Sequence, residues 1–413
     1  MSEIKNIIYL TYQSFPANTA NSLQTISNIK YFIKNGVDVN LVFPLREKKS
    51  SADLNIINKH YGESLEFKVT GSQHNYPFGR INNSSRFLYL ISHFLWSKKI
   101  VKNEYKNIDR STVFFTRSDW IFFFLSKRKY PVIFECHQYT KIRKLLIYLS
   151  LKNEKSKIIF LNDNLKIDYE KKYSLNNNYS VLQNGVDTEL FLDSYKKNNQ
   201  LIFVGNLTRF GKSRNIDFII NSFLKLDSSY ELKIIGAKKG EEESFSELLK
   251  NESTKDRIQI LPYMGHREVI KHILESEIGI LINSEKNMHS TRYTSPLKYF
   301  EYLYSGLKVL AVDFPAHRNL PFSKNIVFFE NNNSQNFILI DTVGFIRDLP
   351  TNLISAFKST LDEIIFSDLI LHVRDISDKD FHNHASEVVK VLEEIGINSC
   401  DERIIEVFNK YDL

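Results

Sequence analysis

Two short motifs near the end of the chain have the residue types and spacing of a nucleotide-binding site. Asp341-Thr-Val-Gly344 directly follows an apolar, strand-like run, which would let its carboxylate face a magnesium ion at the end of a strand. Asn409-Lys410-Tyr-Asp412 follows a second such run, and the last carboxylate can accept hydrogen bonds from the edge of guanine. Such a site also needs a phosphate-binding loop, Gly-x-x-x-x-Gly-Lys-Ser/Thr, between a strand and a helix.

The Gly-Lys-Ser sequence at residues 211–213 does not supply that loop. Five residues separate Gly205 from Gly211 where the motif has four, and Arg209 and Phe210 crowd the turn. The sequence also lies far upstream of Asp341, with several predicted strands in between. We therefore interpret this stretch as part of another phosphate site, and keep a divergent nucleotide loop over 205–213 as the alternative.

A second group of candidate residues lies in the middle of the chain. Basic side chains follow the apolar run 201–206, in a loop that precedes a predicted helix: Arg209, Lys212 and Arg214. Further along, a Pro-started helix begins near Ser295 and carries Lys298 and Glu301. Cationic side chains and a helix N-terminus are the groups that neutralise a diphosphate.

The elements that would position these residues alternate between strand and helix. Residues 6–12, a helical segment ending at Gly36 and the strand 38–44 open the chain, and a second set of strands and helices begins at 201. This alternation predicts an α/β protein with two Rossmann-like domains, whose ligands meet the carboxyl ends of parallel strands. We predict domains at 1–190, 191–335 and 336–413.

The charge distribution separates the last segment from the rest. Residues 336–413 contain 7 Lys and Arg against 15 Asp and Glu, whereas residues 1–335 contain 48 against 33. The change falls at the polar run that begins at Glu330, "ENNNSQNF". Two units of different character are therefore predicted to meet there.

Three stretches of residues 5–330 together resemble a glycosyltransferase family. "VLQNGVDTELF" (181–191), "LIFVGNLTRFGKSRNIDFII" (201–220) and "SPLKYFEYLYSGLKVLAVD" (295–313) are similar to the retaining glycosyltransferases of family four, which have the GT-B fold. The resemblance implies transfer of a hexose from a nucleotide-sugar donor to a glycan or lipid-linked acceptor, with retention of configuration. It implies no metal or cofactor, and polysaccharide biosynthesis as the setting.

The same resemblance assigns roles to individual residues. The donor diphosphate is expected to be held by Arg209, Lys212, Arg214, Ser295 and Lys298. Glu301 corresponds to the acid that accepts hydrogen bonds from ribose hydroxyls, and His137, with Glu135 beside it, to the histidine near the reacting sugars. Eight residues before Glu301, where the family has a further acid, this sequence has Tyr293. This departure leaves a catalytically inactive carbohydrate-binding protein as an alternative.

The sequence also bears on location. No signal peptide is recognisable at the N-terminus, and the apolar stretch Phe87–Trp96 is too short to span a bilayer. Cys136 and Cys400 lie far apart and form no metal-binding or redox spacing. We expect a cytoplasmic protein. The basic, apolar stretch 141–152 predicts peripheral contact with anionic lipid at the inner membrane face, with a packed helix as the alternative.

The tail resembles a different family. Residues 336–413 are similar to the middle of the G domain of the HflX family, which are ribosome-associated GTPases. By that resemblance Asp341 and Gly344 form the magnesium-facing element, and Asn409, Lys410 and Asp412 form the guanine-specific element. No phosphate loop precedes them, which predicts a non-functional GTPase fragment fused to a glycosyltransferase. The alternative is a GTP-binding protein that uses Mg²⁺ and GTP and has the ribosome as its partner.

Overall fold

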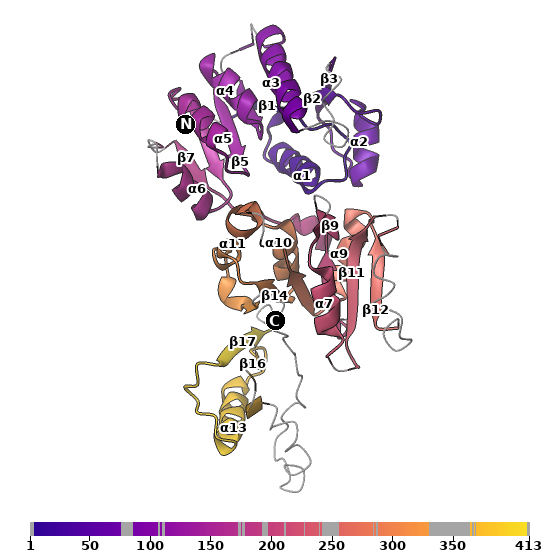
Figure 1. Cartoon of the computed structure of the whole chain (residues 1–413), viewed down its shortest axis with the longest axis vertical. Coiled ribbons are helices and arrows are strands. Elements are labelled where there is room, and N and C mark those ends of the chain that lie inside the picture. The colour runs from indigo at the N-terminus through magenta and orange to yellow at the C-terminus, as the bar shows by residue number, and fades with distance from the viewer. Residues whose placement is uncertain are drawn as a thin grey trace. The chain divides into compact units, whose positions relative to one another are not determined.

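The structure is a computed structural model of the whole chain (Figure 1). It describes residues 4–75, 86–105, 108–109, 112–171, 175, 178–191, 197–209, 212–226, 228–238, 240–241, 256–283, 285, 288–329, 364–365, 367 and 369–410. The chain divides into two compact units. One comprises 1–220 with 229–335, and the other comprises 221–228 with 336–413.

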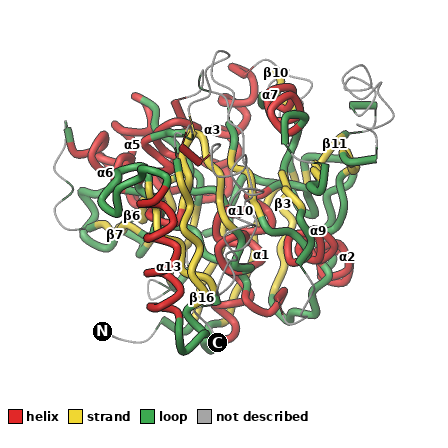
Figure 2. The backbone as a smooth tube through the Cα atoms, turned by 90° about the horizontal axis from the view of Figure 1, so that it is seen from below, coloured by secondary structure: helices red, strands yellow, loops and turns green. Residues whose placement is uncertain are grey.

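The first unit begins with a parallel sheet of seven strands in the order β3-β2-β1-β4-β5-β6-β7. Its strands are β1 Asn6–Leu10, β2 Asp38–Leu45, β3 Lys68–Gln73, β4 Val113–Thr116, β5 Val132–Cys136, β6 Ser156–Phe160 and β7 Tyr179–Val181. The helices between them are α1 Ala20–Lys34, α2 Leu54–Tyr61, α3 Arg86–Asn103, α4 Asp119–Lys127, α5 Lys141–Ser150 and α6 Asp163–Glu170. In Figure 2, α5 and α6 lie beside β6 and β7.

Apolar side chains on both faces explain why this sheet is covered on both sides. Ile8 and Leu10 of β1 belong to one core, whereas Ile7 and Tyr9 belong to another. Successive side chains of a strand point to opposite faces, so a fully apolar strand needs helices on each face. Polar residues fix the helix ends. Thr19 caps α1, for example, by accepting a hydrogen bond from the Ser22 amide at 3.1 Å.

The same unit contains a second parallel sheet, of six strands in the order β12-β11-β8-β13-β14-β15. These are β8 Gln200–Val204, β11 Glu231–Ala237, β12 Ile258–Pro262, β13 Ile278–Leu281, β14 Lys308–Val312 and β15 Ile326–Phe329. A short antiparallel pair, β9 Thr208–Arg209 and β10 Lys212–Ser213, follows β8. The helical elements are η1 Thr188–Phe191, α7 Ile216–Phe223, α9 His266–Leu274, the π-helix η3 His289–Tyr293, α10 Leu297–Tyr304, α11 Pro315–Arg318 and η4 Ser323–Asn325.

Two parallel sheets with crossover helices confirm the predicted α/β class with Rossmann-like domains. The boundary predicted at 190/191 falls inside the first compact unit. It remains a prediction, as do the other domain limits.

In the second unit the described strands β16 Ile370–Asp375 and β17 Ile404–Asn409 pair in parallel, joined through the helix α13 Phe381–Glu394. A strand, a helix and a parallel strand form a crossover unit, as expected for part of an α/β domain. The predicted residues Asp341, Gly344 and Asp412 lie outside the described residues.

Candidate active site

The carboxyl end of β8 turns sharply at Gly205. This glycine has φ +141°, and a Cβ atom built there would lie 3.0 Å from Nη1 of Arg214. A side chain at 205 would therefore be strained and would also press on the guanidinium group. The glycine lets Arg214 lie against the end of β8, at the edge where ligands of parallel sheets bind.

Lys298 places a second cation in this region. It lies in the first turn of α10, and its Nζ is shielded from solvent with no hydrogen-bonding partner among the described residues. The nitrogen lies 4.1 Å from the centre of the Phe203 ring. Burial and the nearby Arg214 charge hold the pKa of Lys298 well below its usual value, and Glu301 acts in the opposite direction. A buried amine without a partner is costly, so this arrangement indicates a place prepared for an anion.

Glu301 lies one turn further along α10 and is 8% exposed. Its Oε1 is 2.7 Å from Nε2 of His266, the first residue of α9. Burial disfavours the imidazolium, but the Glu301 carboxylate, together with Asp187 and Glu63, raises the pKa of His266. One oxygen of the Glu301 carboxylate, which is predicted to bind ribose, is thus already in contact with His266.

The edge of the first sheet carries a second charged group. Nη2 of Arg117, which follows β4, lies 2.9 Å from Oε1 of Glu135 in β5. His137 approaches the same oxygen through Nε2 at 2.7 Å. Burial would raise the pKa of Glu135, but Arg117 and His137 together lower it to about 2. Burial and Arg117 lower the pKa of His137, which favours the neutral imidazole, whereas Glu135 acts in the opposite direction.

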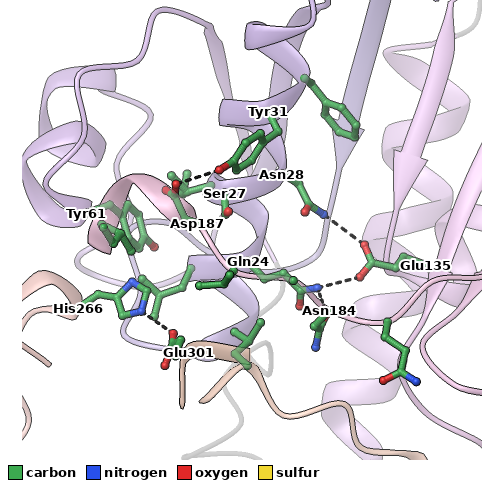
Figure 3. A pocket seen from close by; sticks show the side chains of 18 of the residues that line it. Gln24, Ser27, Asn28, Tyr31, Tyr61, Glu135, Asn184, Asp187, His266 and Glu301 are labelled. Atoms are coloured by element: carbon green, nitrogen blue, oxygen red, sulfur yellow. Dashed lines mark hydrogen bonds and ion pairs between the residues drawn. The ribbon is translucent and has the colours of Figure 1, made fainter. Parts of the chain in front are cut away.

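A cavity of about 360 Å³ is lined by strand residues of the first sheet, including Glu135, and by residues of α9 and α10, including Glu301. Figure 3 shows Glu301 and His266 at one end and Glu135 at the other, with Gln24 and Asn184 between them. Nε2 of Gln24 donates to Glu135 at 3.3 Å and also contacts the side-chain oxygen of Asn184. His137 is not among the residues that line this cavity.

Two predicted positions hold the unit together. The Ser295 hydroxyl accepts a hydrogen bond from the Asn184 amide at 3.1 Å, and Asn184 Nδ2 donates to the Ser295 carbonyl at 2.5 Å. Tyr293 is buried, and its hydroxyl donates to Asp168 of α6 at 2.7 Å. Ser295 therefore contacts residues 184–187, the connector that leads from the first sheet to the second. Tyr293, at the position where the family has an acid, contacts α6 beside the first sheet.

The remaining predicted residues are only partly described. Arg209 and Lys212 pair with each other in the β9–β10 hairpin, but their side chains lie outside the described atoms. Asn409 ends β17, and its side-chain oxygen accepts from the Lys410 amide at 3.0 Å. The Lys410 ammonium group lies 2.5 Å from Oδ2 of Asp375.

Sequence reasoning did not identify Arg117 or His266. Both follow a strand of a parallel sheet directly or after a short turn, which is the signal that could have found them. In the described part of the chain, no cluster of three or more His, Cys, Asp or Glu could hold a metal ion. None of the described helices is long and apolar enough to cross a membrane.

The geometry is that of the GT-B fold, with two Rossmann-like sheets in one unit and polar residues at their carboxyl edges. The chain is similar in structure to HepE of Anabaena in complex with UDP and glucose. That likeness has 12% identity and a TM-score of 0.55, and it covers 94% of this chain and 100% of HepE. It is also similar to an α,α-trehalose-phosphate synthase (UDP-forming) from Burkholderia vietnamiensis, with 10% identity and a TM-score of 0.52, over 76% and 84% of the two chains.

Part of the chain is similar in sequence to HflX GTPases. It is 57% identical over 76 residues to HflX of Flavobacterium psychrophilum, which is 18% of each protein. It is 37% identical over 157 residues to HflX of Lacrimispora saccharolytica, which is 36% of this chain and 32% of that protein. The chain thus spans a third or less of these relatives. No protein-family model matches. The chain combines a GT-B unit with a segment of HflX-like sequence.

Proposed function

We propose that the first unit is a glycosyltransferase that moves a hexose from a nucleotide-sugar donor to a glycan or lipid-linked acceptor. The observation that carries this proposal is the buried amine of Lys298, which lies near Arg214 and Glu301 and has no hydrogen-bonding partner among the described residues. A donor diphosphate would supply the missing negative charge there. The fold supports the same class of substrate, since HepE is in complex with UDP and glucose.

Each residue then has a role in transfer. Arg214 and Lys298 neutralise the diphosphate as the bond between sugar C1 and phosphate oxygen breaks and the phosphate keeps the electron pair. The acceptor oxygen bonds to C1 on the face that the diphosphate leaves, and its proton passes to the departing phosphate oxygen on that face. Glu301 accepts hydrogen bonds from the ribose hydroxyls, and His137 is proposed to act near the reacting sugars through its contact with Glu135, which lines the cavity.

Retention and independence of metal are part of this proposal. Charge on the leaving diphosphate needs stabilisation, and here Arg214 and Lys298 can provide it from fixed positions. Arg209 and Lys212 are proposed as further contributors from the β9–β10 hairpin. The first turn of α10 adds its backbone N–H groups.

The acceptor side is proposed to meet an anionic membrane through α5. Ile142, Leu145 and Leu149 are exposed by 63%, 47% and 37%, and they recur at the spacing of one helix face. Lys152 follows directly, in a stretch with further basic residues. Of the basic residues described in this stretch, Arg143 pairs with Asp119 and Lys144 is buried, so the proposal rests on the exposed apolar face and on Lys152. An exposed apolar helix face is typical of a membrane interface, where a lipid-linked acceptor would be present.

The tail is proposed to be a GTPase fragment without activity. The alternative phosphate loop at 205–213 contains the antiparallel pair β9 and β10, and α7 begins only at Ile216. A phosphate loop instead leads from its Lys and Ser directly into a helix. This observation supports the donor-site interpretation over a ribosome-associated, GTP-binding protein.

A thermal-shift panel of UDP-glucose, GDP-mannose and GTP, each with and without magnesium, tests the proposal. We expect one nucleotide sugar to raise the melting temperature in either condition, and GTP to leave it unchanged. Stabilisation by GTP with magnesium alone would favour the GTP-binding alternative. Stabilisation by free glycans, with none by nucleotide sugars, would favour a carbohydrate-binding protein.

A further inference from the structure

His266 pairs with Glu301 in the proposed donor site, but the proposed transfer reaction gives His266 no role. The two side chains meet at 2.7 Å and are 26% and 10% exposed, although they lie on different helices, α9 and α10. Resting on the proposed function, we propose that His266 is a positioning residue that orients Glu301 for the donor ribose and makes donor affinity fall as pH rises.

The orientation argument begins with the freedom of a glutamate side chain. The terminal torsion of glutamate is broad, so an untethered carboxylate samples many directions. The contact between Nε2 of His266 and Oε1 fixes the carboxylate plane and leaves Oε2 for ribose hydroxyls. A group held in its binding direction before the ligand arrives loses less entropy on binding.

The charges around the imidazole of His266 favour its protonated form. Besides Glu301, Asp187 of the connector and Glu63 after α2 both favour the imidazolium, while burial opposes it, and the pKa of His266 is raised. Lys30 of α1 lies 2.6 Å from Asp187 and 3.5 Å from Glu63, so those two acids are already partly neutralised. The Glu301 carboxylate is therefore the main partner of the imidazolium. Other cations near the pair are Arg267, Lys298 and Arg214.

Protonation of His266 matters for the donor because Glu301 carries a negative charge next to the proposed diphosphate site. An imidazolium on Oε1 offsets that charge, whereas a neutral imidazole leaves it to repel the phosphates. The raised pKa means that the imidazolium is fully formed at low pH and is lost as pH rises through the folded-state value. Donor binding should follow the same direction.

The experiment is a calorimetric titration of UDP-glucose and GDP-mannose into the full chain between about pH 6 and about pH 8.5. The diphosphate of these sugars is a diester that exchanges no proton in this range, so a pH effect reports on the protein. We expect donor affinity of the parent chain to fall about 10-fold across the range, which corresponds to about one pKa unit of coupling. His266→Gln keeps an N–H donor but cannot titrate, and should give an affinity independent of pH.

His272→Gln is the matched control, because His272 lies on the same helix and contacts Glu275 at 3.5 Å and Lys233 at 3.2 Å. It should keep the pH profile of the parent chain. A His266→Gln variant that retains the parent's pH profile would overturn the role of His266 while leaving the glycosyltransferase proposal intact. If the parent chain binds no nucleotide sugar at any pH, the proposed function fails, and this inference fails with it.

Discussion

The ammonium nitrogen of Lys298 lies 4.1 Å from the centre of the Phe203 ring, where it has no hydrogen-bonding partner among the described residues. A charge over an aromatic face gains some electrostatic energy, but less than it loses on leaving water. This pair therefore weakens the free protein. We expect an anionic ligand to supply the missing partner of the Lys298 amine and so to offset this cost.

Lys298→Met should have opposite effects on stability and on donor binding. Methionine keeps the length and packing of the side chain but removes the buried charge, so the free energy of unfolding should rise by roughly 1–2 kcal/mol. Loss of a charge-assisted contact should weaken nucleotide-sugar binding about 10- to 150-fold. Urea denaturation and calorimetry on the same samples measure both. A variant that loses both stability and affinity would show that Lys298 has a structural role.

The stability difference between this variant and the parent chain should depend on pH. The folded-state pKa of Lys298 is lowered, so between that value and 10.5 the unfolded chain binds more protons, and the parent gains stability as pH rises. The advantage of Lys298→Met should therefore shrink between about pH 7 and about pH 10. Denaturant melts at the two pH values check this. A constant or growing difference would contradict the shifted pKa.

Which parts of this arrangement could be predicted from the sequence depends on how far apart along the chain the contacting residues lie. The alternating apolar runs predicted parallel sheets, and residues at strand ends or the start of α10, such as Arg214, Lys298 and Glu301, converge because they lie at one edge of a sheet. The pairing of Tyr293 with Asp168 joins residues 125 positions apart. Only the packing of η3 on α6 brings these two together, and no local pattern encodes it.

Glu301→Gln should weaken donor binding while leaving the fold intact. The amide keeps the size of the side chain but loses the charge that strengthens hydrogen bonds from ribose, which costs roughly 1.5–3 kcal/mol, or about 10- to 150-fold in affinity. Calorimetry with the nucleotide sugar that stabilises the parent chain measures the change. Equal affinities of variant and parent would remove Glu301 from the site.

Transfer or donor hydrolysis should need no divalent metal and should retain the anomeric configuration. The reason is that Arg214 and Lys298 lie near each other, where we propose that the diphosphate binds and its charge develops. Assays with EDTA and with added manganese, followed by NMR of the product anomer, check both points. Activity that EDTA abolishes and manganese restores would contradict the first, and an inverted product the second.

The tail should not bind GTP. Its guanine-specific motif lacks an upstream phosphate loop in the sequence, and Lys410 is already paired with Asp375 at 2.5 Å. Without backbone N–H groups and a lysine around the phosphates, the carboxylate of Asp341, which the HflX resemblance assigns to the magnesium-facing element, would repel them. A fluorescent GTP titration with magnesium checks this. Saturable micromolar binding that Asp412→Asn weakens would contradict it.

The central claim, that the GT-B unit acts on nucleotide sugars, is tested most directly by measuring released nucleoside diphosphate. The full chain is incubated with UDP-glucose, GDP-mannose or GTP, with a membrane lipid extract as the acceptor source, and the products are separated by chromatography. We predict release of UDP or GDP from a nucleotide sugar, reduced in both Glu301→Gln and Lys298→Met at subsaturating donor, with no hydrolysis of GTP. Turnover of GTP alone, with every nucleotide sugar left intact, would contradict the account.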